Sequence, residues 1–200
     1  MAIQRYTIEG YGQLELNQVA FRRDGRIEAQ CKLNATDFAS APAENGMILA
    51  IDQINREVIL PNYTGASGDD PASWDDDLYA LNYTTEHMYD DRANALKDFA
   101  LTPGTFLPRL GFLAVGDKFT TNTVSYDTSE FAAAGTKTSD VVFEEAVADV
   151  ATTALYGGLT TDGSITVSAT KPIGGPVLKV TKATTMPDGT FGIKFQVVAD

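Results

Sequence analysis

Hydrophobic and polar residues alternate with a period of two along several stretches of the chain, and turn-forming pairs separate these stretches. In residues 26–33 the alternate apolar positions are Ile27, Ala29, Cys31 and Leu33. Successive side chains of a strand point to opposite faces, so this pattern predicts a strand with one buried face. Because Asp24 and Gly25 come directly before it, and Asp-Gly is a typical hairpin turn, we expect a hairpin with the alternating residues 14–21.

The same pattern returns near the C-terminus, where residues 177–182 and 192–198 alternate on either side of a turn. Two short apolar runs, 47–51 and 57–60, flank the polar residues 52–56 and predict a third hairpin. Such short connections are typical of antiparallel sheets, in which a tight turn joins neighbouring strands.

Two more stretches extend this pattern. Residues 111–115 and 119–126 flank a turn at Gly116 and Asp117 and predict a fourth hairpin, while residues 164–169 alternate as a further strand. The chain is therefore expected to be mainly β. We predict a β-sandwich or a barrel-like set of antiparallel hairpins with one or two short helices, in a single β-rich domain spanning residues 1–200.

One segment has the periodicity of a helix. Residues 141–151 place Phe143, Ala146 and Val147 on one face, which predicts the main helix, with a cap at residues 139–140. The β-branched residues in this segment favour a pair of strands instead, so both structures stay open. For residues 81–100 we expect a turn or a short helix.

Residues 62–80 interrupt the alternation and form an irregular acidic excursion. Long irregular segments within a compact domain are usually functional or mobile. If Trp74 is exposed, it is a candidate anchor for a partner, because aromatic residues carry much of the energy of protein interfaces. A ring that covers its own loop is the alternative. The candidate partner-contact loop consists of Asp69, Asp70, Trp74, Asp75, Asp76 and Asp77.

Composition limits the class of protein. The 200 residues include 44% hydrophobic residues, enough for a core without disulfides, and the single Cys31 is expected to be a small buried hydrophobe. The net charge of −12 argues against direct binding to nucleic acid. No segment approaches the roughly 18 consecutive apolar residues of a membrane span, and the N-terminus lacks the pattern of a signal peptide. The Asn-x-Thr triplets at Asn34, Asn62 and Asn82 are therefore interpreted as chance matches.

The sequence contains no motif for catalysis or for a cofactor. His87 is the only histidine, no nucleophile elbow is present, and a typical structural zinc site needs four N or S ligands. The acidic residues lack the spacing of a calcium loop, and Gly10 and Gly12 lack the remainder of a phosphate-binding loop. We therefore expect no catalytic residues, no cofactor and no metal site.

Three stretches carry a resemblance to a known class of proteins. The pattern of turns and strands is similar to that of structural proteins of tailed bacteriophage virions in residues 45–52, 107–122 and 186–195. The chain most resembles the accessory proteins of phage heads, namely capsid decoration, cement or head-fibre base proteins. This resemblance implies a non-enzymatic β-rich module that is made in the host cytoplasm and becomes part of the virion.

The resemblance also implies the partners, which would be the major capsid protein and copies of the chain itself. A symmetric oligomer is expected, because virion parts occupy symmetric sites. A tail-tube or other tail protein is one alternative, with residues 141–155 as its outer helix. A carbohydrate-binding, adhesin-like module is another, in which Trp74, Tyr79 and Tyr83 would stack on sugars.

Overall fold

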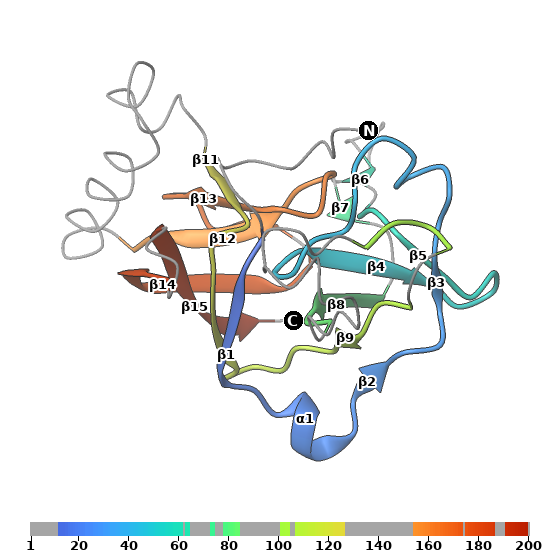
Figure 1. The fold of residues 1–200 in the computed structure, drawn as a ribbon. Coiled ribbons are helices and arrows are strands. Elements are labelled where there is room, and N and C mark those ends of the chain that lie inside the picture. Colours follow the sequence, from blue (N-terminus) through green and yellow to red (C-terminus); the bar gives the residue numbers. More distant parts are fainter. Residues whose placement is uncertain are drawn as a thin grey trace.

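The computed structural model describes residues 12–61, 63–64, 73–74, 78–84, 101–104, 107–126, 154–173, 175–186 and 191–199. Across these ranges the protein is mainly β with one short helix, as the alternation in the sequence predicted (Figure 1). The helix is α1 (Phe21–Asp24). The strands are β1 (Leu14–Gln18), β2 (Ile27–Glu28), β3 (Lys32–Leu33), β4 (Ile48–Asp52), β5 (Glu57–Ile59), β6 (Tyr63–Thr64), β7 (Ser73–Trp74), β8 (Leu78–Asn82), β9 (Leu110–Gly111), β10 (Lys118–Thr121), β11 (Val124–Tyr126), β12 (Tyr156–Leu159), β13 (Ile165–Ser168), β14 (Val177–Thr185) and β15 (Phe191–Ala199).

The strands of the described ranges form two large sheets and one small pair. The seven-stranded sheet has the order β1-β10-β15-β14-β12-β13-β11, and the six-stranded sheet has the order β2-β9-β8-β4-β5-β3. The remaining strands, β6 and β7, pair with each other. Most neighbouring strands are antiparallel, whereas β11 runs parallel to β13 and β3 runs parallel to β5.

A hydrophobic cluster joins the two large sheets. It contains Ile48 and Leu81 from the six-stranded sheet together with Phe119 and Phe195 from the seven-stranded sheet. The ring centroids of these two phenylalanines lie 5.7 Å apart, within the usual range for aromatic pairs. The sheets therefore share one core, in a sandwich or half-barrel arrangement.

The six-stranded sheet is covered on both faces. Ile48 faces the shared core, whereas its neighbour Leu49 belongs to a second cluster with Phe38, which comes from the connection before β4. This double burial explains the uninterrupted apolar run at residues 47–51.

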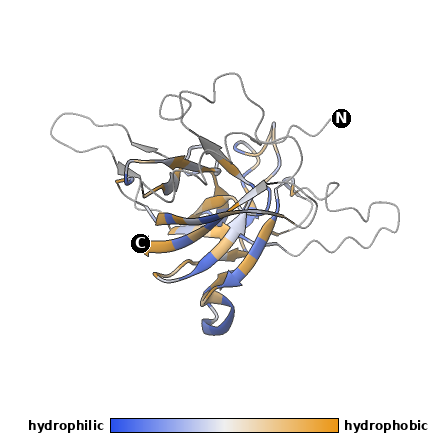
Figure 2. Ribbon diagram, turned by 90° about the vertical axis from the view of Figure 1, so that its left-hand side faces the viewer, coloured by the Kyte–Doolittle hydropathy of each residue, from blue (hydrophilic) through white to orange (hydrophobic). Residues whose placement is uncertain are grey.

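The seven-stranded sheet turns one face toward the shared core. On its other face Thr120 is buried beside Met186, whereas Lys179 and Lys182 are exposed. Figure 2 shows hydrophobic and hydrophilic residues alternating along its strands.

Two predicted hairpins are confirmed. β14 and β15 pair in antiparallel register from Val177 opposite Ala199 to Thr185 opposite Phe191. β4 and β5 also pair antiparallel, with Asp52 opposite Glu57. In both cases the two strands are neighbours in the sequence, so the local pattern also identifies the partner.

The predicted hairpin at Asp24 and Gly25 is wrong. Gly25 has a φ of 69° and ends α1 in the left-handed conformation that favours glycine. The chain then enters β2, which pairs with β9 rather than with β1. Residues 26–33 are two short strands, because β2 and β3 lie at opposite edges of the six-stranded sheet.

Because residues 26–33 form two separate strands, only some of their predicted core positions are buried. Cys31 and Leu33 are buried, as the alternation predicted. In contrast, Ile27 is 39% exposed and Ala29 is also exposed, because β2 lies at a sheet edge and the chain leaves it before β3.

The predicted hairpin of residues 111–115 and 119–126 is also wrong, because its two arms lie in different sheets. β9 belongs to the six-stranded sheet, while β10 and β11 belong to the seven-stranded sheet. The buried carboxylate of Asp117 fixes the crossing between them, since it accepts hydrogen bonds from the backbone N–H groups of Ala20 (2.7 Å) and Ala114 (2.9 Å).

The remaining expectations have mixed outcomes. The acidic excursion was predicted to reach residue 80, but β8 begins at Leu78 and is an interior strand of the six-stranded sheet. The predicted turn or helix at 81–100 is wrong at its start, because Leu81 and Asn82 complete β8. Residues 85–100 and 127–153, which include His87 and nearly all of the predicted main helix, lie outside the described residues.

A buried polar network ties the chain before β4 to strands of both sheets. The side-chain amide of Asn82 donates to the backbone oxygen of Glu44 at 2.9 Å, and the hydroxyl of Thr123 donates to the backbone oxygen of Asn45 at 2.7 Å. Asn82 is fully buried. Its Asn-x-Thr triplet is therefore closed to glycosylation in the folded protein.

Candidate partner-contact site

The predicted partner-contact loop lies largely outside the described residues. The residues concerned are Asp69, Asp70, Asp75, Asp76 and Asp77. For Trp74 the backbone alone is described, and it pairs with that of Tyr63 between β7 and β6. The contact role of this loop stays a prediction.

A different candidate contact surface lies at the tip of the β4–β5 hairpin. Ile54 is 94% exposed there, more than any other large hydrophobic residue of the described ranges. Burying an isoleucine side chain against another protein would remove its apolar area from water and yield about 1.5–3 kcal/mol. This residue is therefore suited to anchor a contact.

The carboxylate of Asp52 holds the tip in shape. Its Oδ1 accepts hydrogen bonds from the backbone N–H groups of Ile54 (2.8 Å) and Asn55 (2.9 Å), and its Oδ2 accepts one from Asn55 Nδ2 at 2.6 Å. These hydrogen bonds, with the backbone bond from Asn55 as the strongest cause, lower the pKa of Asp52. Because the loop is held by its own side chains, a partner would pay little conformational entropy to bind it.

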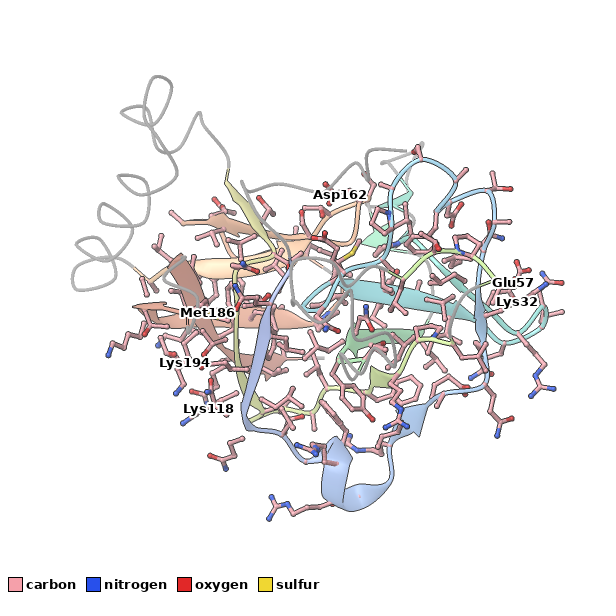
Figure 3. All side chains as sticks on the ribbon, in the orientation of Figure 1. Lys32, Glu57, Lys118, Asp162, Met186 and Lys194 are labelled. Atoms are coloured by element: carbon pink, nitrogen blue, oxygen red, sulfur yellow. The ribbon has the colours of Figure 1, made fainter. Side chains whose placement is uncertain are left out.

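Polar and charged pairs surround the base of the hairpin. Glu57 lies 3.0 Å from the Lys32 ammonium and accepts a hydrogen bond from Asn34 at 2.6 Å, while Arg56 donates to Gln30 at 2.9 Å. The bond from Lys32, followed by that from Asn34, lowers the pKa of Glu57. In Figure 3 Lys32 and Glu57 lie close together at the right-hand side of the molecule. An apolar centre within a polar rim is the usual anatomy of a protein interface.

Cys31 lies close to this hairpin but is not a reactive group. It is 5% exposed, and burial is the main cause that raises the pKa of its thiol, followed by the charge of Glu28. The thiol form therefore dominates at neutral pH. The prediction of a small buried hydrophobe is confirmed.

The described ranges contain no group of three or more His, Cys, Asp or Glu residues placed to hold a metal ion. Thr160, Asp162 and Ser164 do gather between β12 and β13. The carboxylate of Asp162 accepts bonds from the Ser164 backbone (2.9 Å), the Ser164 hydroxyl (2.7 Å) and the Thr160 hydroxyl. These bonds close a turn around Gly163, whose φ is 81°, so the cluster has a structural role.

Two tyrosines proposed for sugar stacking are partly buried. Tyr79 and Tyr83 pack against the shared core, and the Tyr83 ring lies 5.0 Å from that of Phe21. Burial is the main cause that raises the pKa of Tyr83. Both rings are therefore partly covered by the protein's own core. In the part of the chain that the structure describes, no helix is both long and apolar enough to cross a membrane.

The candidate contact at the Ile54 tip was not predicted from the sequence. The available signal was a single apolar residue within the polar residues 52–56, but its exposure depends on how the loop folds. Comparisons with protein-family models, curated proteins and solved structures found no match for this chain.

Proposed function

We propose that this protein is a non-enzymatic structural protein of a tailed-phage virion, and specifically a capsid decoration or cement protein. The observation that carries the proposal is the β4–β5 hairpin tip, where Ile54 is held in solvent within a polar rim. The resemblance of residues 45–52, 107–122 and 186–195 to head accessory proteins supports the choice of partner, which is the major capsid protein.

In this proposal the hairpin tip inserts Ile54 into an apolar depression of the capsid lattice. The ion pair of Lys32 and Glu57 would remain at the wet rim, where charges set orientation more than affinity. Many weak copies of such a contact can reinforce a shell, because each copy bridges neighbouring capsid subunits and the contacts act together.

Quantitative mass spectrometry of purified particles, separated into heads and tails, tests the location. A signal in the heads at a simple ratio to the major capsid protein is the expected result. A signal in the tails would replace this proposal with the tail-protein alternative. Absence from both fractions would overturn a virion role, and glycan binding by the purified chain would then favour the carbohydrate-binding module.

The contact residue is tested by rebinding purified protein to particles assembled without it. We expect Ile54→Asp to weaken binding by about 30-fold or more, since it replaces an apolar anchor worth ~2 kcal/mol with a charge. The matched control is Ile173→Asp, because Ile173 is also strongly exposed at 77% but lies in the loop between β13 and β14. Equal binding of the two variants would exclude the hairpin tip as the contact.

A further inference from the structure

The face of the seven-stranded sheet that points away from the shared core carries a cluster of lysines on three adjacent strands. We call this cluster the lysine face. Its members are Lys118 on β10, Lys179 and Lys182 on β14, and Lys194 on β15. Lys179 and Lys182 are exposed, whereas Lys118 and Lys194 are partly buried.

Strand register places the four ammonium groups on one side of the sheet. Lys118 and Lys179 are both opposite Gln196 of β15, and Lys182 is opposite Lys194. The intervening positions face the shared core and are occupied by Phe119, Val180 and Phe195. In Figure 3 Lys118 and Lys194 lie near each other at the lower left, on the opposite side of the molecule from Lys32 and Glu57.

The lysine face concentrates positive charge with little compensation. Lys182 and Lys194 are cross-strand neighbours, and like charges in this relation are destabilising. In the described strands of this sheet Glu15 is the one acidic residue, and because it lies opposite Thr120, which is opposite Lys194, it is a single carboxylate on the same side as the four lysines. Among the described residues the ion pairs are those of Arg26 with Asp24 and of Lys32 with Glu57, and none of the four lysines pairs with a described carboxylate. An anionic partner would relieve this repulsion.

The same chain carries a large excess of carboxylates elsewhere. The described ranges contain eleven of the fifteen basic residues and nine of the 27 acidic residues, which gives a charge of +2. The rest of the sequence holds the other four basic and eighteen acidic residues, which gives −14 and accounts for the total of −12. Each copy therefore brings both a basic face and the carboxylates that complement it.

We infer that the lysine face binds the acidic residues of a second copy of this chain. The contact is heterologous, since the lysines of one copy meet carboxylates of the next, and such contacts build rings or filaments. This inference goes beyond the proposed function, because it concerns another face and holds whether or not the protein binds a capsid.

Nucleic acid fits this face less well than a second copy does. Lysines and arginines that neutralise phosphates supply nearly all of the non-specific affinity of proteins for DNA. Here four lysines would have to bind DNA against a net charge of −12. Duplex DNA is the competing occupant, and a binding experiment separates it from a second copy.

Sedimentation velocity of the full chain over a concentration series tests the inference. We expect association that weakens when salt rises from about 0.05 M to about 0.5 M, since exposed charges are screened. Lys179→Glu/Lys182→Glu is expected to raise the dissociation constant by ~10-fold or more, because attraction becomes repulsion. The control Arg22→Glu/Arg109→Glu changes two exposed cations beside Tyr83, directly after β8 in the six-stranded sheet, by the same total charge and should retain association.

Carbodiimide cross-linking of mixed isotopically light and heavy copies identifies the occupant directly. The expected products join a lysine of the face in one copy to an Asp or Glu of another, and they are absent from Lys179→Glu/Lys182→Glu. A chain that stays monomeric at low salt, or products confined to single copies, would overturn the inference. So would equal loss of association in both variants, with thermal unfolding showing that each is folded. Binding of duplex DNA by this face without self-association would overturn it as well.

Discussion

At the scale of single residues, Gly46 shows how closely the two sheets are joined. Its φ is 87°, and a Cβ there would lie 2.0 Å from the Thr121 hydroxyl, which donates to the backbone oxygen of Gln13 at 2.7 Å. Gly46→Ala therefore combines left-handed strain with displacement of a bonded side chain. We expect it to lower the free energy of unfolding by ~3 kcal/mol or more in urea denaturation.

A substitution at Gly104 measures the backbone strain without the displaced side chain. Its φ is 82°, nearly that of Gly46, but nothing lies within 4 Å of a Cβ at this position. Gly104→Ala is therefore expected to cost only the backbone strain, about 1–2 kcal/mol. Equal losses in the two variants would mean that the close approach to Thr121 contributes nothing.

At the scale of elements, the sequence predicted strands better than it predicted their partners. β14 and β15 were predicted as a pair because alternation flanks one turn, whereas the alternating residues 111–126 divide between two sheets that are joined by distant side chains such as Asp117. The four-residue α1 is too short for a helical period to show. Local periodicity records which face is buried, and strand pairing is set by contacts far along the chain.

The two proposed contact surfaces also could not be predicted from the local sequence pattern. The polar positions of residues 177–182 and 192–198 already contain three lysines, but the addition of Lys118 to them depends on the pairing of β10 with β15. Ile54 was visible as an apolar residue in a polar loop, but its fixed exposure depends on the side-chain hydrogen bonds of Asp52. Neither surface follows from spacing alone.

The β4–β5 hairpin predicts a pH dependence of stability. The pKa values of Asp52 and Glu57 are lowered from their ordinary values of 3.8 and 4.5. Their stabilising contribution is therefore present above those values and is lost as pH falls through the lower pKa values of the folded state. We expect the thermal unfolding midpoint to decrease below about pH 4.5.

Two variants test whether the Lys32–Glu57 pair causes this decrease of the unfolding midpoint at acid pH. Glu57→Gln removes the titrating group, and Lys32→Met removes the strongest cause of its shift. Both are expected to give a flatter dependence of the unfolding midpoint on pH than the unmodified chain. Curves that run parallel to that of the unmodified chain would contradict a role for this ion pair.

At the scale of the whole molecule, the fold places the two proposed contact surfaces on opposite sides. The hairpin tip belongs to the six-stranded sheet and the lysine face to the seven-stranded sheet, and Figure 3 shows their labelled residues far apart. Distant sites that share no partners act independently, with additive effects to within about 0.5 kcal/mol. Ile54→Asp should therefore leave the dissociation constant of self-association unchanged, measured by sedimentation velocity at low salt.

The combined variant Ile54→Asp/Lys179→Glu/Lys182→Glu makes this independence quantitative. Its free energy of unfolding should change by the sum of the separate changes, and its self-association should match that of the lysine variant alone. If Ile54→Asp by itself weakened self-association as much as the lysine substitutions do, the two surfaces would be parts of one interface. The independent result would instead describe a module that joins its own copies through one sheet and leaves the hairpin tip free for another partner.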